Sequence, residues 1–384
     1  MSALAGWMRG IPVIAFAALV GSAPAPAATY VYVSNADDGD ISTYTLLDSG
    51  DLQVGARVKA ASVVMPMAVS PDRRFLYAAS RSKPYRVHVY AIDRATGALK
   101  QFSSSPLAES FPYISLDRTG HFLLGASYGG NVVSVNAIEA DGRVAVEPLQ
   151  VIPVGRNAHS IRIDASNRFV YVPTLGSDQI FMFTFDTKTG KLNSNTPAVY
   201  LARPVTGPRH FVTSADNRFL YLLSELLATV TSFALDANTG LLTEIGSASG
   251  LPPDTKLVPG TPRVAVGAAS SAPPRNRDHD IWAADIHLTP DGRFLYISER
   301  TSNSLGAFSV NAQSGKLTYQ GGTPTEAQPR GFAIAPNGRF LVACGEKSET
   351  ISVYAIDQAS GALALLRKYP GGKGANWVEI VSFG

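Results

Sequence analysis

The chain has 384 residues, of which 45% are hydrophobic, and it contains 34 Gly and 25 Pro. This composition can supply a large buried core with many turns, and it excludes an intrinsically disordered protein. A formal net charge of +3, without any cluster of Lys and Arg, gives no support for nucleic acid or a membrane surface as a partner.

The first 27 residues differ in kind from the rest. Arg9 precedes an apolar run over 11–20, and the small residues of 22–28 offer a cleavage site of the Ala-x-Ala type. We interpret residues 1–27 as a secretory signal peptide, because the apolar run is short for a membrane span. This interpretation predicts a periplasmic protein with no membrane attachment after cleavage.

One sequence unit recurs along residues 28–384: a polar turn followed by Arg-Phe-Leu-Tyr or a close variant. Its aromatic anchors are spaced by about 45–50 residues, with one spacing of about 75, and such a period indicates a repeat architecture. The anchors are Tyr30, Phe75, Phe122, Phe169, Phe219, Phe294 and Phe340. Each unit has the pattern of four short strands, so we predict an all-β fold, a single seven-bladed β-propeller over residues 28–384.

The two ends of the chain predict how the ring closes. Tyr30 begins at the second strand of its unit, whereas 376–382 matches a first strand and is followed by almost nothing. We therefore expect the C-terminal strand to complete the N-terminal blade, which removes both open sheet edges. The unit before Phe294 is longer than the others by roughly 25 residues, and we expect the excess, 249–280, to form a loop over one face. The sequence favours neither a lid nor a tolerated insertion.

The stretch 207–225 shows how one unit positions polar side chains. Its strand patterns at 209–213 and 219–223 flank a turn, which is typical of an antiparallel hairpin. The start of the first strand and the end of the second then lie side by side. Arg209 and Glu225 are therefore predicted to share one face of the molecule.

Applied to all units, the same phase selects polar residues at one mouth of the central channel. Positions ten before and six after each anchor face this mouth, and positions nine before an anchor come next. These positions give His159, Arg209, Arg330, Arg81, Glu225, Arg300, Glu346, His210 and Asp285. Any one of them can be explained as an ion pair between blades. The whole set is what acyl hydrolysis requires, because an imidazole or carboxylate can activate water and guanidinium groups can stabilise the oxyanion of an attacked lactone.

Other catalytic signatures are missing from the sequence. There is no His-Glu-x-x-His, no Cys pair and no Gly-x-Ser-x-Gly, so a zinc hydrolase and a nucleophile elbow have no support. The single cysteine, Cys344, lies in an apolar segment and is expected to be a buried core residue. We expect no cofactor. A calcium ion held by scattered Asp and Asn side chains at the channel is the less favoured alternative.

Four segments carry a family resemblance. They are Asn-Ala-His-Ser at 157–160, Gly-Pro-Arg-His at 207–210, Trp-Ala-Ala-Asp-Ile-His-Leu-Thr-Pro-Asp-Gly-Arg at 282–293 and Gln-Pro-Arg-Gly-Phe at 328–332. Together they resemble the bacterial 6-phosphogluconolactonase family of seven-bladed propeller lactonases, whose relatives include fungal 3-carboxymuconate lactonising enzymes and periplasmic gluconolactonases. The resemblance covers nearly the whole chain after residue 28.

This resemblance implies roles for particular residues. In the fungal enzymes the proposed site consists of a histidine, two arginines and a glutamate, whose motifs match His159, Arg209, Glu225 and Arg300. His159 or Glu225 is expected to act as general base, and the two arginines to polarise the carbonyl and stabilise the oxyanion. Substrate-binding contacts are expected from Asp285, Arg330, His210, Arg81 and Glu346.

The resemblance also implies a small-molecule sugar lactone as the substrate. Where cytoplasmic phosphogluconolactonases often carry a lysine after the third inner hairpin, this chain has Leu-Gly-Ser-Asp at 175–178. This departure and the signal peptide favour hydrolysis of glucono-1,5-lactone to gluconate. The alternatives are a 6-phosphogluconolactonase, a cycloisomerase acting on a carboxylated muconate, and a propeller that serves only as a binding platform. Nothing in the sequence indicates the oligomeric state.

Overall fold

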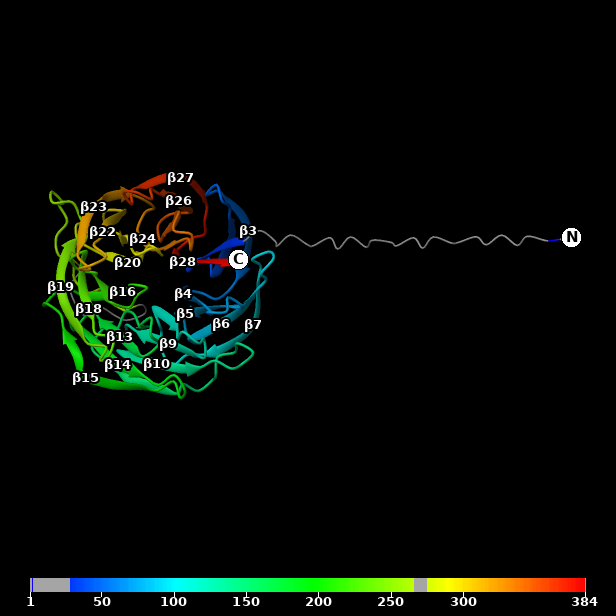
Figure 1. The fold of residues 1–384 in the computed structure, drawn as a ribbon, viewed down its shortest axis with the longest axis horizontal. Coiled ribbons are helices and arrows are strands. Elements are labelled where there is room, and N and C mark those ends of the chain that lie inside the picture. Colours follow the sequence, from blue (N-terminus) through cyan, green and yellow to red (C-terminus); the bar gives the residue numbers. More distant parts are fainter. Residues whose placement is uncertain (1, 3–27, 266–274, 384) are drawn as a thin grey trace.

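The computed structural model describes residue 2, residues 28–265 and residues 275–383. Within these ranges, seven four-stranded antiparallel sheets surround a central axis as the blades of a propeller, and no helix is present (Figure 1). The prediction of an all-β, seven-bladed propeller is therefore confirmed. None of the described residues forms a helix that could cross a membrane. The predicted signal peptide, residues 1–27, lies outside the described residues except for residue 2.

Each blade has four strands, which follow one another in order from the channel to the rim. The innermost strands are β28 (Ala375–Phe383), β4 (Val64–Val69), β8 (Tyr113–Leu116), β12 (Arg162–Ile163), β16 (Pro208–Thr213), β20 (Ala283–Leu288) and β24 (Pro329–Ile334). The second strands are β1 (Ala28–Asn35), β5 (Phe75–Ser80), β9 (Phe122–Ser127), β13 (Phe169–Thr174), β17 (Phe219–Ser224), β21 (Phe294–Glu299) and β25 (Phe340–Gly345).

The outer half of each blade completes the sheet. The third strands are β2 (Asp40–Leu46), β6 (Arg86–Ile92), β10 (Val132–Ala137), β14 (Gln179–Phe185), β18 (Thr229–Leu235), β22 (Ser304–Val310) and β26 (Thr350–Ile356). The rim strands are β3 (Leu52–Lys59), β7 (Leu99–Pro106), β11 (Gln150–Pro153), β15 (Leu192–Leu201), β19 (Leu242–Ser249), β23 (Leu317–Pro324) and β27 (Leu363–Pro370).

The repeat phase and the ring closure agree with the sequence. Apart from β1, every second strand begins at its aromatic anchor. Strand β28 pairs antiparallel with β1, with Tyr30 opposite Val381, so the C-terminal strand completes the N-terminal blade as predicted. In Figure 1 the red C-terminal strand accordingly lies beside the blue one. Cys344 is fully buried in β25, also as predicted.

Adjacent blades are joined by a repeated contact between an anchor ring and a turn glycine. At each of these glycines φ is positive, and an added Cβ would lie 2.2–2.6 Å from the ring. Only glycine combines this backbone conformation with so close an approach. The pairs are Tyr30 with Gly97, Phe75 with Gly142, Phe122 with Gly190, Phe169 with Gly240, Phe219 with Gly315, Phe294 with Gly361 and Phe340 with Gly50. Because the last pair joins the final blade to the first, the contact runs around the whole ring.

Tyrosine hydroxyl groups reinforce these blade contacts. In four blades, a tyrosine two residues after the anchor donates to the carbonyl oxygen of the glycine that the anchor ring contacts. The distances are 2.9 Å from Tyr32 to Gly97, 3.0 Å from Tyr77 to Gly142, 2.8 Å from Tyr171 to Gly240 and 2.7 Å from Tyr296 to Gly361. Tyr221 occupies the equivalent position, but its buried hydroxyl has no hydrogen-bond partner among the described residues.

This difference predicts unequal effects of removing the hydroxyl. Replacing Tyr77 with Phe should lower the free energy of unfolding by about 1 kcal/mol, because a buried hydrogen bond is lost and its acceptor is left unpaired. Replacing Tyr221 with Phe should leave the free energy of unfolding unchanged or raise it slightly. Urea denaturation of both variants measures the two values. Equal losses in both variants would contradict this account of the blade contacts.

Candidate active site

A cavity of about 320 Å³ lies at one mouth of the channel. Seven of the nine polar residues predicted for this mouth line it: His159, Arg209, Arg330, Arg81, Glu225, Arg300 and Glu346. They come from five of the seven blades, and all are buried or nearly so. The repeat phase therefore brings the predicted residue types together in one cavity.

The centre of the cavity wall is a carboxylate held by two guanidinium groups. Glu225 accepts hydrogen bonds from Nε of Arg209 at 2.7 Å and from Nη2 of Arg300 at 3.1 Å. Arg209 has 0% exposure, and Glu225 has 2%. Buried charged side chains of this kind are tolerated in a protein interior because each charge is paired and hydrogen-bonded. The hairpin prediction that Arg209 and Glu225 share one face is confirmed.

The two guanidinium groups keep a net positive charge in this wall. Arg209 also donates to the carbonyl oxygen of Ala284, and its Nη2 has no acceptor among the described residues. Arg300 donates to the carbonyl oxygens of Trp282 and Ala283, both at 3.0 Å. Burial, followed by the charge of Arg300, lowers the pKa of Arg209 to about 9. Arg209 therefore stays a cation at neutral pH.

His159 supplies a neutral imidazole beside these cations. It precedes the short strand β12, and its backbone N–H donates to the carbonyl oxygen of Pro173 at 3.1 Å. The ring packs edge to face against Tyr128 and His210, at centroid distances of 5.5 and 5.1 Å. Burial, followed by the charge of Arg209, holds the pKa of His159 well below its ordinary value. The imidazole is therefore neutral at neutral pH, and one of its ring nitrogens can accept a proton.

Further cations line the same cavity. Nε of Arg330 lies 3.6 Å from the carboxylate of Glu346, which also accepts a hydrogen bond from Gln328 at 2.6 Å. Arg81 donates from Nε to the hydroxyl of Ser110 at 3.2 Å. Six basic and three acidic side chains line the cavity in all, which leaves an excess of three positive charges. The site is therefore suited to a polar, electron-rich or anionic ligand.

The long insertion contributes residues that the repeat phase does not select. Arg263, Val264 and Ala265 line the cavity. Two guanidinium groups lie over the ring of Trp282, with Cζ of Arg263 at 4.3 Å and Cζ of Arg300 at 3.7 Å from the ring centroid. Residues 263–265 of the predicted loop 249–280 thus lie at this mouth. Its residues 266–274 are outside the described ranges.

Tyr128 fixes this insertion to the blade of β9, because its hydroxyl donates to the carbonyl oxygen of Arg263 at 2.7 Å. Tyr128 lies six residues after the anchor Phe122, so the repeat phase places it at the mouth. It is absent from the predicted set because its side chain is uncharged at neutral pH. Arg263 has no equivalent in the other units, and the sequence offered no signal for it.

Two predicted substrate contacts lie elsewhere. His210 and Asp285 line a second cavity, of about 440 Å³, which the innermost strands of all seven blades form farther along the channel. The cause is a β-bulge in β16 between Pro208 and Phe211, and another in β20 between Ala283 and Ile286. A bulge breaks the alternation of side chains. Arg209 therefore lines the first cavity while its neighbour His210 lines the second.

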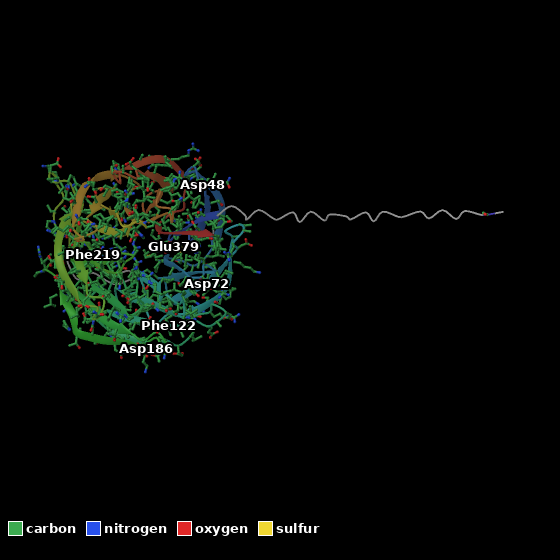
Figure 2. All side chains as sticks on the ribbon, viewed as in Figure 1. Asp48, Asp72, Phe122, Asp186, Phe219 and Glu379 are labelled. Atoms are coloured by element: carbon green, nitrogen blue, oxygen red, sulfur yellow. The ribbon has the colours of Figure 1, made fainter. Side chains whose placement is uncertain are left out.

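Three of the rings that line the second cavity pack against one another. His210 contacts Tyr113 and Trp377 at centroid distances of 4.9 and 6.1 Å, and Tyr113 contacts Trp377 at 5.3 Å. Glu379, labelled near the middle of the ring in Figure 2, lines this cavity and accepts a hydrogen bond from Trp377 at 2.9 Å. Burial raises the pKa of Glu379 to about 7. Over the described residues, no group of three or more His, Cys, Asp or Glu is arranged to hold a metal ion.

The chain is similar to known proteins both in sequence and in fold. Residues 26–380 match the family described as "Lactonase, 7-bladed beta-propeller". A 6-phosphogluconolactonase of Serratia proteamaculans is 39% identical over 352 residues, 92% of this chain and 98% of the relative. One of Pectobacterium carotovorum is 37% identical over 355 residues, with the same coverage. The solved structure of a Pseudomonas aeruginosa periplasmic gluconolactonase superimposes with a TM-score of 0.78 at 26% identity, covering 92% of this chain and 99% of that one.

Proposed function

We propose that this chain, which belongs to the seven-bladed β-propeller lactonase family, hydrolyses the ester bond of a sugar lactone in the cavity formed by His159, Arg209 and Arg300. One observation carries the proposal. A neutral imidazole and two buried guanidinium groups, held by a single carboxylate, converge on one cavity. Hydrolysis of a lactone needs a base for water and fixed positive charge for the oxyanion.

The proposed reaction proceeds by direct attack of water. His159 takes a proton from the water molecule while its oxygen forms a bond to the carbonyl carbon. Negative charge then develops on the carbonyl oxygen, where Arg209 and Arg300 stabilise it. The bond between the carbonyl carbon and the ring oxygen breaks, and the imidazolium returns the proton to that ring oxygen. The product is the open aldonic acid, and no covalent intermediate with the protein forms.

Geometry favours His159 over Glu225 as the base. Both guanidinium groups donate to the same oxygen of Glu225, Oε2. These two donors occupy that oxygen and hold the carboxylate in place between the arginines. The imidazole of His159 has no such partner at Nδ1 among the described residues. We therefore assign Glu225 to the positioning of the two arginines.

For the substrate we propose glucono-1,5-lactone, hydrolysed in the periplasm. This choice is supported by the signal-peptide pattern of residues 1–27 and by the likeness to the Pseudomonas aeruginosa periplasmic gluconolactonase. The second candidate is the 6-phosphate of the same lactone. It is favoured by the name of the Serratia relative and by the excess of three positive charges in the cavity. Membership of a lactonase family makes the cycloisomerase and the binding platform less favoured.

The two candidates differ in a direct rate measurement. We expect the mature chain, residues 28–384, to hydrolyse glucono-1,5-lactone faster than its 6-phosphate in a pH-stat, after subtraction of spontaneous hydrolysis. A chelator should leave the rate unchanged. Faster turnover of the phosphate would establish the second candidate. No rate above the spontaneous one on either lactone would refute the proposed hydrolysis.

A pH profile tests the assignment of the base. The histidine must be neutral to accept a proton, and burial with Arg209 holds the pKa of His159 well below about 6.5, the ordinary value. The value of kcat/KM should therefore stay level from about pH 8 down to pH 6.5 and decline only at lower pH. His159→Gln should lower kcat by about a hundredfold or more, whereas the exposed control His121→Gln should not. An acid limb centred above pH 6.5 would contradict the assignment.

A further inference from the structure

A buried hydrogen-bonded chain supports Arg209 from the side away from the first cavity. Nη1 of Arg209 lies 3.1 Å from Nε2 of His210. Nδ1 of His210 lies 2.9 Å from Oδ1 of Asp285, and Oδ2 of Asp285 lies 3.1 Å from Nε2 of His287. Arg209 and His210 are 0% and 2% exposed. The chain therefore links Arg209 to the second cavity without passing through the first.

Hydrogen-bond chemistry fixes the tautomer of His210. A guanidinium nitrogen can only donate, so Nε2 of His210 must accept, and the ring proton must be on Nδ1. That proton is donated to Asp285. Burial, followed by the charge of Arg209, holds the pKa of His210 well below its ordinary value, so the ring is neutral. Burial alone would raise the pKa of Asp285, but His287 and the hydrogen bond from His210 outweigh it, and the carboxylate stays ionised.

The ring of His210 is also fixed sterically. Tyr113, Trp377 and His159 all pack edge to face against it. His210 thus touches both Arg209, which we assign to the oxyanion, and His159, which we assign to the base. A shift of about 1 Å in such groups can reduce a rate by about a hundredfold.

We infer that His210 and Asp285 are positioning residues, which hold Arg209 at its correct place by a fixed imidazole acceptor and take no part in substrate binding. This inference rests on the proposed function of the first cavity. A similar use of a carboxylate to fix a histidine tautomer is known from hydrolytic triads, where an amide in place of the carboxylate selects the wrong tautomer. Here the imidazole acts on an arginine instead of on a nucleophile.

Two substitutions at His210 separate the contacts. In His210→Gln the side-chain oxygen can replace Nε2 as acceptor for Arg209. In His210→Asn the amide N–H can replace Nδ1–H as donor to Asp285, and the acceptor for Arg209 is lost. We expect the Gln variant to keep kcat within about fivefold and the Asn variant to lose about a hundredfold, with KM within about twofold in both. Equal losses in both variants, or a change confined to KM, would overturn the inference.

Asp285→Asn tests the other link. The amide can donate to Nδ1 of His210, which moves the ring proton to Nε2 and directs it at Arg209. We expect kcat to fall at least about tenfold, again with little change in KM. Glu379→Gln is the matched control, because it removes a carboxylate that lines the same second cavity but lies outside the chain to Arg209. It should leave kcat unchanged, and a loss equal to that of Asp285→Asn would overturn the inference.

A measurement that needs no substrate separates this inference from the proposed function. Nitrogen NMR of protein labelled in its 6 histidines, with the signals of His210 assigned from the variants above, reports which ring nitrogen carries the proton. We expect neutral His210 with the proton on Nδ1 in the wild type and on Nε2 in Asp285→Asn. A wild-type ring protonated on Nε2, or on both nitrogens at neutral pH, would overturn the inference even in an active enzyme. An inactive wild type with the expected tautomer would refute the proposed function while the arrangement of Arg209 and His210 stood.

Discussion

The burial of one guanidinium group, that of Arg209, constrains the centre of this propeller. A cation without exposed surface is stable only if surrounding acceptors replace its water. The carboxylate of Glu225, the carbonyl oxygen of Ala284 and the imidazole of His210 do so, and they come from two adjacent blades. The bulge in β16 is part of the same requirement, because it lets two consecutive residues face the channel. The geometry of the cavity follows from satisfying this one charge.

Most of the fold could be predicted from the sequence because each repeat carries the same short pattern of turn residues and an aromatic anchor. The unit of turn, arginine and aromatic anchor marks the start of the second strand in five blades, and in a sixth blade His121 replaces the arginine. The turn glycines could be recognised as turns, but their contact with the anchor of the preceding blade could not. That contact joins residues at least 67 positions apart in the sequence, and nothing local to either one indicates the partner. The pairing of the C-terminal strand with the N-terminal blade was predictable, because 376–382 matches a first strand and the N-terminal unit lacks one.

The candidate site was predictable to the extent that strict strand alternation holds. The repeat phase correctly predicted that Arg209, Glu225 and Arg300 lie together, since each lies where an inner hairpin reaches the mouth. It failed for His210 and Asp285, because a β-bulge inserts a residue without any clear mark in the sequence. Arg263 could not be predicted for a different reason, because it lies in an insertion that occurs in one unit only. Residues of a repeat are thus located by its phase, and departures from the repeat require the structure.

The measurement that tests this account most directly is the turnover of Arg209→Ala against wild type on whichever lactone the wild type hydrolyses. Circular dichroism should first establish that the variant keeps its β-sheet fold. We predict that kcat/KM falls at least about a hundredfold, as for the loss of one fixed donor to an oxyanion. An intact fold with an unchanged rate would contradict the central claim that the buried guanidinium of Arg209 stabilises the transition state.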